Sequence, residues 1–152
     1  MPCEILLNGL THLLGTQLKS NDIVEITQLD VVRNFGAEYR KEKLSCAPTQ
    51  QTVWFANDYT CASLYWVTEF KARIKGTVTR QEQRNKGYGS SMLIYLLNYV
   101  AQKSNEIGKK IEVESYARNP KWYLDNGFVI KRVTPWGVTV VTKVIDGANG
   151  GH

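Results

Sequence analysis

Arg84-Asn85-Lys86-Gly87-Tyr88-Gly89 joins a predicted strand, residues 71–79, to a predicted helix that begins at Ser90. Glycine at positions 87 and 89 lets the backbone approach a ligand closely and adopt conformations that a side chain would forbid. Several backbone N–H groups can then point at one anion, aided by the positive end of the helix dipole. Arg84 and Lys86 add two cations, so the segment predicts a loop that binds a pyrophosphate.

Other phosphate-binding loops fit this segment poorly. It lacks the Gly-Lys-Ser/Thr ending of a nucleotide P-loop, and it lacks the first glycine and the acidic strand end of a dinucleotide fingerprint. Taken alone, paired glycines can also do no more than close a turn between a strand and a helix. The neighbouring sequence has to decide between these interpretations.

Residue periodicity on both sides of the loop predicts alternating helices and strands. Apolar spacing of three to four predicts helices at about 5–18, 30–44 with Asp30 as its cap, 90–108 and 119–124. Alternation of period two predicts strands at 22–27, 52–56, 61–67, 71–79, 110–115, 128–133 and 138–145. This order is typical of an α/β (α+β type) domain, a mixed sheet flanked by helices.

Length and composition limit the organisation of the chain. With 152 residues it is expected to form one domain, 1–145, with an amphipathic helix near the start and a loose glycine-rich tail at 146–152. Three widely spaced cysteines predict reduced thiols and a cytoplasmic protein, and they fit no metal-ligand pattern. No segment is expected to span a membrane. The net charge of +5 would attract anions, including a phosphate-rich cofactor.

A second motif, Tyr123-Leu124-Asp125-Asn126-Gly127-Phe128, follows a predicted strand. Together the two motifs resemble the signatures of the GCN5-related N-acetyltransferases, the GNAT superfamily: Arg/Gln-x-x-Gly-x-Gly/Ala before a helix, then Tyr-x-x-x-Gly-Phe. The resemblance covers about residues 23–145. It implies a mixed, mostly antiparallel sheet of six to seven strands with about four helices, and acetyl-coenzyme A as co-substrate.

The resemblance also implies roles for particular residues. The family holds the pantetheine arm on the strand before the loop and the pyrophosphate on the loop itself, which here are Thr77, Val78, Thr79, Arg84, Asn85, Lys86, Gly87, Tyr88, Gly89 and Ser90. A backbone N–H near Val78 would polarise the thioester carbonyl. Tyr123 matches the tyrosine that gives a proton to the departing thiolate. Without the family match, Tyr123 could equally be a core aromatic residue.

The acceptor is predicted less directly. Where many relatives carry a glutamate, the strand before the loop has Arg73 and Lys75, and Lys71 lies on the same face. These cations either solubilise the strand or favour an acidic or phosphate-bearing acceptor, with Glu114 as a further acceptor contact. The candidates for a general base are Glu69, Glu112 and Glu114, each of which could be an ordinary strand residue, and water could relay the proton instead.

Two other functions stay open on the sequence alone. A non-catalytic coenzyme A or nucleotide sensor would keep the loop but would not need Tyr123. A basic nucleic-acid module could use aromatic side chains for stacking, namely Tyr59, Tyr65, Trp66 and Trp136. An acetyltransferase acting on a nucleotide or nucleic acid would combine these features, and the protein is expected to be a monomer or a homodimer.

Overall fold

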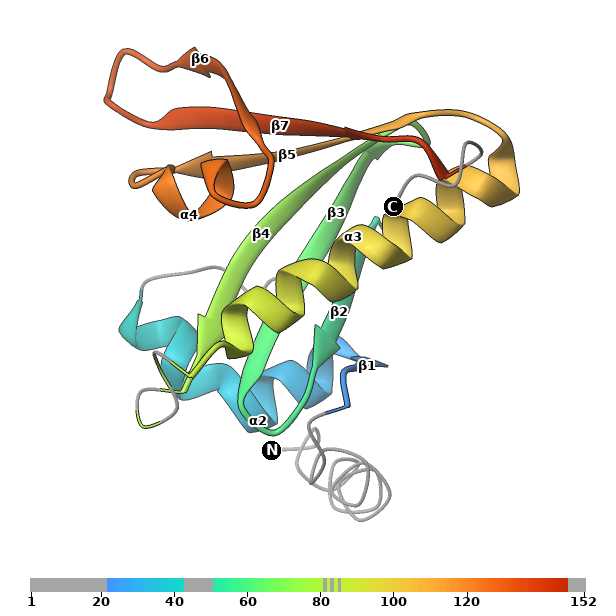
Figure 1. Ribbon diagram of the computed structural model, residues 1–152. Coiled ribbons are helices and arrows are strands. Elements are labelled where there is room, and N and C mark those ends of the chain that lie inside the picture. The colour runs from blue at the N-terminus through green and yellow to red at the C-terminus, as the bar shows by residue number, and fades with distance from the viewer. Residues whose placement is uncertain (1–21, 43–50, 81, 83, 85, 148–152) are drawn as a thin grey trace. The chain divides into compact units, whose positions relative to one another are not determined.

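The computed structural model describes residues 22–42, 51–80, 82, 84 and 86–147, and Figure 1 shows their helices and strands. In chain order the elements are β1 (Val24–Ile26), α2 (Gln28–Lys41), β2 (Thr52–Ala56), β3 (Thr60–Thr68), β4 (Lys71–Thr79), α3 (Tyr88–Ile107), β5 (Ile111–Ala117), α4 (Lys121–Leu124), β6 (Val129–Val133) and β7 (Thr139–Ile145). The helix predicted at about 5–18 lies outside the described residues. No helix within the described ranges is long and apolar enough to cross a membrane.

The strands form a seven-stranded sheet in the order β1-β2-β3-β4-β5-β7-β6. The pairs β1/β2, β5/β7 and β6/β7 are antiparallel, while β4 and β5 run parallel. The predicted mixed sheet of six to seven strands is therefore confirmed. In the described part of the chain it is accompanied by three helices.

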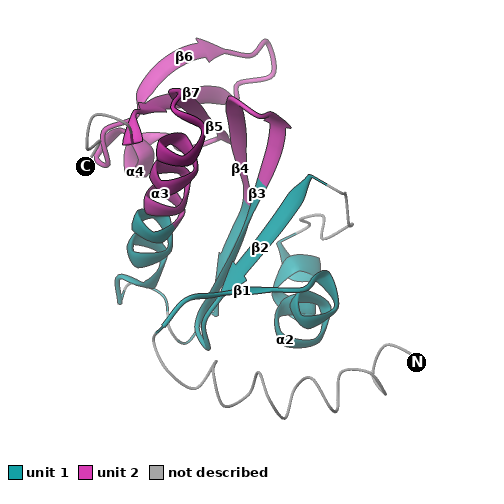
Figure 2. Ribbon diagram, turned by 90° about the vertical axis from the view of Figure 1, so that its right-hand side faces the viewer, with its two compact units in different colours: residues 1–64, 76–95 teal, residues 65–75, 96–152 magenta. Residues whose placement is uncertain are grey.

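The chain divides into two compact units, coloured separately in Figure 2. Of the described residues, unit 1 contains those up to Leu64 and the segment 76–95, and unit 2 contains 65–75 and those from Leu96 onward. Strands β3 and β4 and helix α3 each contribute residues to both units. The single domain expected for 1–145 stays a prediction, and each unit is described by itself below.

The N-cap of helix α2 lies three residues before the predicted one. Thr27 is the N-cap, and its hydroxyl accepts a hydrogen bond from the backbone N–H of Asp30 (3.2 Å). The Asp30 carboxylate accepts one in return from the N–H of Thr27 (3.1 Å). The pair forms a capping box with aspartate in place of the usual glutamate or glutamine, so the prediction of Asp30 as the cap was wrong. The helix ends at Lys41 rather than at residue 44.

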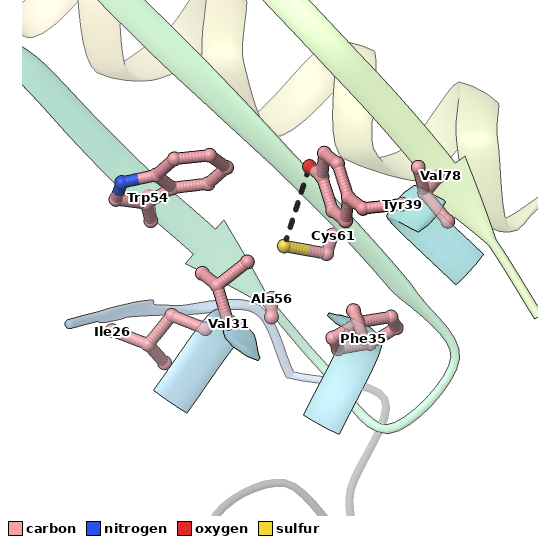
Figure 3. Close-up of a cluster of buried hydrophobic side chains, with 8 residues drawn as sticks. All are labelled: Ile26, Val31, Phe35, Tyr39, Trp54, Ala56, Cys61 and Val78. Carbon is pink, nitrogen blue, oxygen red and sulfur yellow. Dashed lines mark hydrogen bonds between the residues drawn. The ribbon is translucent and has the colours of Figure 1, made fainter. Parts of the chain in front are cut away.

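The core of unit 1 forms where α2 packs on strands of the sheet. Val31, Phe35 and Tyr39 are spaced by four residues, so they share one face of the helix, and all three are buried. They pack against residues of β1 to β4, namely Ile26, Trp54, Ala56, Cys61 and Val78 (Figure 3). Burial of several large apolar side chains in one cluster is a major source of stability for a unit of this size.

Gly76 allows β4 to pass close to α2. Its φ is +60°, and a Cβ added there would lie 2.9 Å from a ring carbon of Tyr39. The Tyr39 hydroxyl donates a hydrogen bond to the Gly76 carbonyl (2.5 Å). A side chain at this position would therefore meet both backbone strain and the Tyr39 ring, which explains a glycine in the middle of a strand.

Unit 2 is built around β5. Its parallel pairing with β4 runs from Lys71↔Glu112 to Ile74↔Ser115. On its other side β5 pairs with β7 along its whole length, from Ile111↔Ile145 to Ala117↔Thr139. The β6–β7 turn is closed by Thr134, whose N–H donates to the Val138 carbonyl (2.8 Å).

A β-bulge interrupts β6, the last strand in the sheet order. Ile130 pairs with Val141 and Arg132 pairs with Val140, so Lys131 is an extra residue. Because of this extra residue, two consecutive side chains reach toward β5: Lys131 contacts Glu112 (3.0 Å) and Arg132 contacts Tyr116 (2.9 Å).

The start of the predicted tail is held in unit 2. The N–H of Gly147 donates to the hydroxyl of Ser104 on α3 (3.0 Å), and this hydroxyl donates to the carbonyl of Lys109 (2.5 Å). Ser104 is fully buried. Residues 148–152, the rest of the predicted tail, lie outside the described residues.

Replacing Gly76 with alanine tests the contact with Tyr39. We expect the free energy of unfolding to fall by about 3 kcal/mol, because backbone strain adds to overpacking against the ring. Gly137→Ala is the matched control, since Gly137 also has a positive φ (+85°) but nothing lies within 4 Å of an added Cβ. It should cost only about 1 kcal/mol. Equal losses in urea unfolding would contradict a special role for the Tyr39 contact.

Candidate functional site

The predicted pyrophosphate loop leads into α3 within unit 1. Gly87 has a φ of +85°, and a Cβ added there would meet nothing within 4 Å. Its carbonyl accepts a hydrogen bond from the N–H of Ser91 (3.0 Å), so α3 follows it directly, beginning at Tyr88. The first turn of α3 has no acidic residue. An exposed glycine backbone at the start of a 20-residue helix suits the binding of an anion. Asn85 lies outside the described residues.

Arg84 has protein partners at the entrance to this loop. Its guanidinium forms an ion pair with Glu42, the residue that caps the end of α2, and its Nε donates to the carbonyl of Thr79 (3.2 Å). A phosphate that binds Arg84 therefore has to compete with the Glu42 carboxylate. No sequence motif indicates Glu42 as a partner, because 42 residues separate it from Arg84 along the chain.

Tyr88 stacks on a tyrosine from another part of unit 1. The rings of Tyr59, in the β2–β3 turn, and Tyr88 are 4.4 Å apart and 26° from parallel. Tyr59 is one of the aromatic residues predicted as possible base-stacking groups, and in the structure its ring stacks on Tyr88. The contact fixes the first residue of α3 against the turn, a constraint that periodicity alone does not reveal.

The strand end Thr77–Thr79 is held by side chains of unit 1. The Val78 carbonyl accepts a hydrogen bond from the Thr60 hydroxyl (2.9 Å). The Thr60 hydroxyl in turn accepts a hydrogen bond from the Thr79 hydroxyl (3.2 Å). Val78 is buried in the unit 1 core. The predicted contact of this backbone with a pantetheine arm, and the role of an N–H near Val78, stay predictions.

Tyr123 lies on α4 in unit 2, packed between aromatic rings. The centroids of Trp122 and Phe128 are 4.9 and 5.2 Å from its own, both with edge-on geometry. Its hydroxyl accepts a hydrogen bond from the hydroxyl of Ser115 on β5 (3.0 Å). The packing predicted for a core aromatic residue and the polar contact expected of a proton donor are both present.

The short helix that carries Tyr123 has well-defined ends. Pro120 is its N-cap, and the side chain of Asn119 accepts a hydrogen bond from the N–H of Lys121 (3.3 Å). Beyond the end of the helix, Gly127 has a φ of +88°. The N–H of Phe128 returns to the Tyr123 carbonyl (3.1 Å). These contacts fix the position of Tyr123 relative to Phe128.

Burial raises the pKa of Tyr123 above its usual value of 10.0, and the hydrogen bond from Ser115 partly opposes this shift. The side chain is therefore protonated at neutral pH and can act as a proton donor. This protonation state is the one that the predicted catalytic role requires.

Two predicted acceptor residues bind each other in unit 2. Nε and Nη2 of Arg73 both donate to Oε1 of Glu114, at 3.0 and 2.8 Å. Lys71 approaches the other carboxylate oxygen at 3.6 Å. The Glu114 side chain is only 2% exposed. Both oxygens of this carboxylate contact cations, so the structure gives Glu114 the features of an ion-pair residue.

The other base candidates are placed differently. Glu112 accepts hydrogen bonds from Thr142 (2.6 Å) and Lys131 (3.0 Å). The hydrogen bond from Thr142 is the main cause of a lowered pKa for Glu112, and Lys131 adds to it. Glu69 lies exposed in the β3–β4 turn.

Lys75, the second predicted acceptor cation, is exposed, and its ammonium lies 5.3 Å from the centre of the Tyr65 ring.

The predicted site residues thus fall into two groups, each described within its own unit. The loop and the strand end 77–79 belong to unit 1, and Arg73, Lys75, Glu114 and Tyr123 belong to unit 2. Among the described residues, no three histidine, cysteine, aspartate or glutamate side chains gather as metal ligands would.

Comparison with solved structures identifies the fold that the sheet order and the glycine loop before α3 belong to. No family model matches the sequence, and no curated protein matches it in sequence. Similar solved structures include an N-acetylglutamate synthase, an aminoglycoside 6'-acetyltransferase and a spermidine N-acetyltransferase. The chain therefore has the GNAT fold, as the two sequence motifs predicted.

Three of these structures illustrate the similarity. Rv2747 from Mycobacterium tuberculosis, solved with coenzyme A, has a TM-score of 0.65 and 10% identity over 82% of this chain and 99% of its own. The spermidine N-acetyltransferase SpeG from Vibrio cholerae, solved as a mutant, has a TM-score of 0.61 and 14% identity over 81% of this chain and 92% of its own.

N-acetylglutamate synthase from Neisseria gonorrhoeae, complexed with coenzyme A and L-arginine, has a TM-score of 0.59 and 15% identity over 80% of this chain. The present chain spans only 32% of that protein's length.

A glutamate at position 89 tests the loop. Gly89→Glu places bulk and negative charge beside the backbone N–H groups at the start of α3, and we expect it to abolish binding of acetyl-coenzyme A in calorimetry. Gly108→Glu makes the same change just beyond the other end of α3, where nothing lies within 4 Å of an added Cβ, and should leave the affinity unchanged. Equal affinity of wild type and Gly89→Glu would show that the cofactor binds elsewhere.

Proposed function

We propose that this protein is an N-acetyltransferase, which transfers an acetyl group from acetyl-coenzyme A to an amine by direct attack in a ternary complex. The observation that carries the proposal is the GNAT fold combined with the Arg84–Gly89 motif at the start of α3. Solved structures of this fold include complexes with coenzyme A. The exposed glycine backbone and the nearby cations suit the cofactor's pyrophosphate.

The reaction begins when an uncharged amine attacks the thioester carbonyl carbon and forms a C–N bond. The oxygen of the tetrahedral intermediate carries negative charge, which a backbone N–H near Val78 would stabilise. When the intermediate collapses, the C–S bond breaks and its electron pair leaves with the sulfur. Tyr123 would then transfer its hydroxyl proton to that sulfur. For an acceptor that starts as an ammonium, the products are an amide, a thiol and one released proton.

The raised pKa of Tyr123 supports its role as the proton donor. A group that acts in its protonated form stays active up to its folded-state pKa, so a raised pKa extends the active range toward alkaline pH. The rate should not fall through loss of the Tyr123 proton below about pH 10.

The proton on the incoming amine is best accepted by water. Glu112 and Glu114 are held in ion pairs, and Glu69 is exposed in a turn. A water relay needs no dedicated carboxylate if part of the amine arrives uncharged. We therefore assign no general base to a side chain.

The acceptor we propose is acidic or phosphate-bearing. Lys71 and Arg73 share one carboxylate, that of Glu114, so the first part of β4 has more cationic than anionic side chains. Lys75, exposed on the same strand, adds a further cation. Such a surface attracts anions and repels polyamines and basic peptides.

The proposed function also includes the cytoplasmic location and the monomeric or dimeric state predicted from the sequence.

The proposal is tested by identifying ligands and then measuring turnover. Native mass spectrometry of the purified protein should detect bound coenzyme A or acetyl-coenzyme A. A thiol-release screen over amines, nucleotides, peptides and polyamines should then find an acceptor. With that acceptor, Tyr123→Phe should lower kcat about 10- to 100-fold with little change in cofactor affinity, because its hydroxyl acts chiefly as the thiolate departs.

Tyr95→Phe is a suitable control, because it removes a hydroxyl from a tyrosine of unit 1 that was assigned no catalytic role. An unchanged rate for Tyr123→Phe in a chemistry-limited assay would return Tyr123 to the role of a core aromatic residue. Tight cofactor binding without thiol release for any acceptor would favour the non-catalytic sensor.

Charge reversal on β4 tests the acceptor class. Lys75→Glu should raise the KM for the acceptor several-fold while the KM for acetyl-coenzyme A changes little, and added salt should weaken the same interaction in the wild type. Lys110→Glu, an equal change at an exposed position before β5, is the control. A polyamine or basic peptide as the best acceptor, used better by Lys75→Glu, would disprove an acidic acceptor.

A further inference from the structure

Ser115 is a buried polar residue of unit 2 with no role in the function proposed so far. It lies on β5, is 3% exposed, and its register partner on β4 is Ile74. Its hydroxyl lies 3.0 Å from the Tyr123 hydroxyl and 3.5 Å from the Ile74 carbonyl oxygen. A serine hydroxyl carries one hydrogen, so it donates to one of these two oxygens at a time.

The distances favour Tyr123 as the acceptor of that hydrogen. Hydrogen bonds between a hydroxyl and an oxygen are usually 2.5–3.0 Å long, and the contact with Ile74 is well beyond this range. The Ile74 carbonyl nevertheless gives the Ser115 hydrogen an alternative direction. Ser115 can thus donate to Tyr123, or turn toward Ile74 and accept a hydrogen from Tyr123.

Among the described residues, the other groups near Tyr123 are aromatic rings and charged side chains that have partners of their own. The rings of Trp122 and Phe128 contact the Tyr123 ring edge-on. On α4 and just after it, Lys121 and Asp125 bind each other at 2.7 Å. Lys143 on β7 donates to the carbonyl of Asn126. Glu114 and Tyr116, next to Ser115 on β5, extend from the opposite face of the strand.

None of these charged groups contributes to the shift in the Tyr123 pKa, which comes from burial and from the Ser115 hydrogen bond. The two effects oppose each other. Burial disfavours the tyrosinate, and a donor hydrogen bond favours it. Ser115 is therefore the group that opposes the effect of burial on this half-buried phenol.

We propose that Ser115 is a positioning residue for acetyl transfer, whose hydroxyl holds the Tyr123 oxygen in place and donates a hydrogen bond to it as the phenol gives up its proton. The inference rests on the proposed role of Tyr123. In the step concerned, the C–S bond breaks, the sulfur takes the electron pair, and the Tyr123 proton moves to the sulfur. The resulting tyrosinate accepts the Ser115 hydrogen bond until a proton from solvent restores the phenol.

Titration of Tyr123 tests this inference without any knowledge of the acceptor. Protein labelled with ¹³C at the tyrosine ζ carbon is titrated by NMR, and the Tyr123 signal is assigned by its loss in Tyr123→Phe. In Ser115→Ala the Tyr123 pKa should rise by about one unit, because burial is no longer opposed. Ser115→Thr keeps the hydroxyl and should restore the wild-type value. Circular dichroism verifies that each variant stays folded over the pH range used.

Kinetics with the acceptor found by thiol release provide the second measurement. Ser115→Ala should lower kcat about tenfold with an unchanged KM for acetyl-coenzyme A, and the alkaline limb of its rate profile should move to higher pH. Ser115→Thr should recover most of the rate. In a Tyr123→Phe background, Ser115→Ala should have no further effect, because the hydroxyl that it serves is gone.

The outcomes separate this inference from the proposed function. A slow Tyr123→Phe together with wild-type titration and rate in Ser115→Ala would overturn the role of Ser115 and leave Tyr123 as the proton donor. Equal losses from Ser115→Ala in the presence and absence of the Tyr123 hydroxyl would also overturn it, since Ser115 would then act on packing alone. Wild-type turnover in Tyr123→Phe would remove the proposed roles of both Tyr123 and Ser115 and leave the acetyltransferase activity in place.

Discussion

The ring of Tyr39 lies against the backbone of Gly76, and its hydroxyl donates to the Gly76 carbonyl. Two ion pairs continue this connection along unit 1: Glu38 binds Arg80 and Glu42 binds Arg84. The partners are four residues apart in both segments. The end of α2 is therefore bound to the chain at two points, once just after β4 and once at the start of the loop. The geometry of the predicted pyrophosphate loop therefore depends on α2, which contributes no residue to the GNAT motifs.

Glu114 has the corresponding position in unit 2, as a buried carboxylate between Arg73 and Lys71. A buried charge is tolerated only when it is paired, and removing one partner leaves the other uncompensated. This explains why a strand with three alternating cations can pack against its neighbour. It also means that the charge pattern of β4 alone overstates the positive field, because β5 supplies a carboxylate that lies 41 residues away in sequence.

Local patterns predicted the elements well: the bounds of β2 and β4 agree with the structure, and the motifs around Gly87 and Tyr123 identified the GNAT fold. The sequence could not predict partners brought together by tertiary structure. Glu42 with Arg84, Tyr59 with Tyr88, and Ser115 with Tyr123 have no periodic or motif signal. The misplaced cap of α2 has a different cause, since Thr27 and Asp30 form a reciprocal pair in which either residue resembles a cap.

The extra residue Lys131 in β6 also affects the association of this strand with other copies of the protein. The strand exposes Val129, Ile130 and Val133, and apolar exposed strands at the end of a sheet tend to recruit strands from other chains. The bulge breaks the regular spacing of hydrogen-bonding groups that such recruitment needs, and it directs two cations to one face. One inserted residue thus makes this strand a poorer template for pairing, while the apolar side chains on either side of it remain in place.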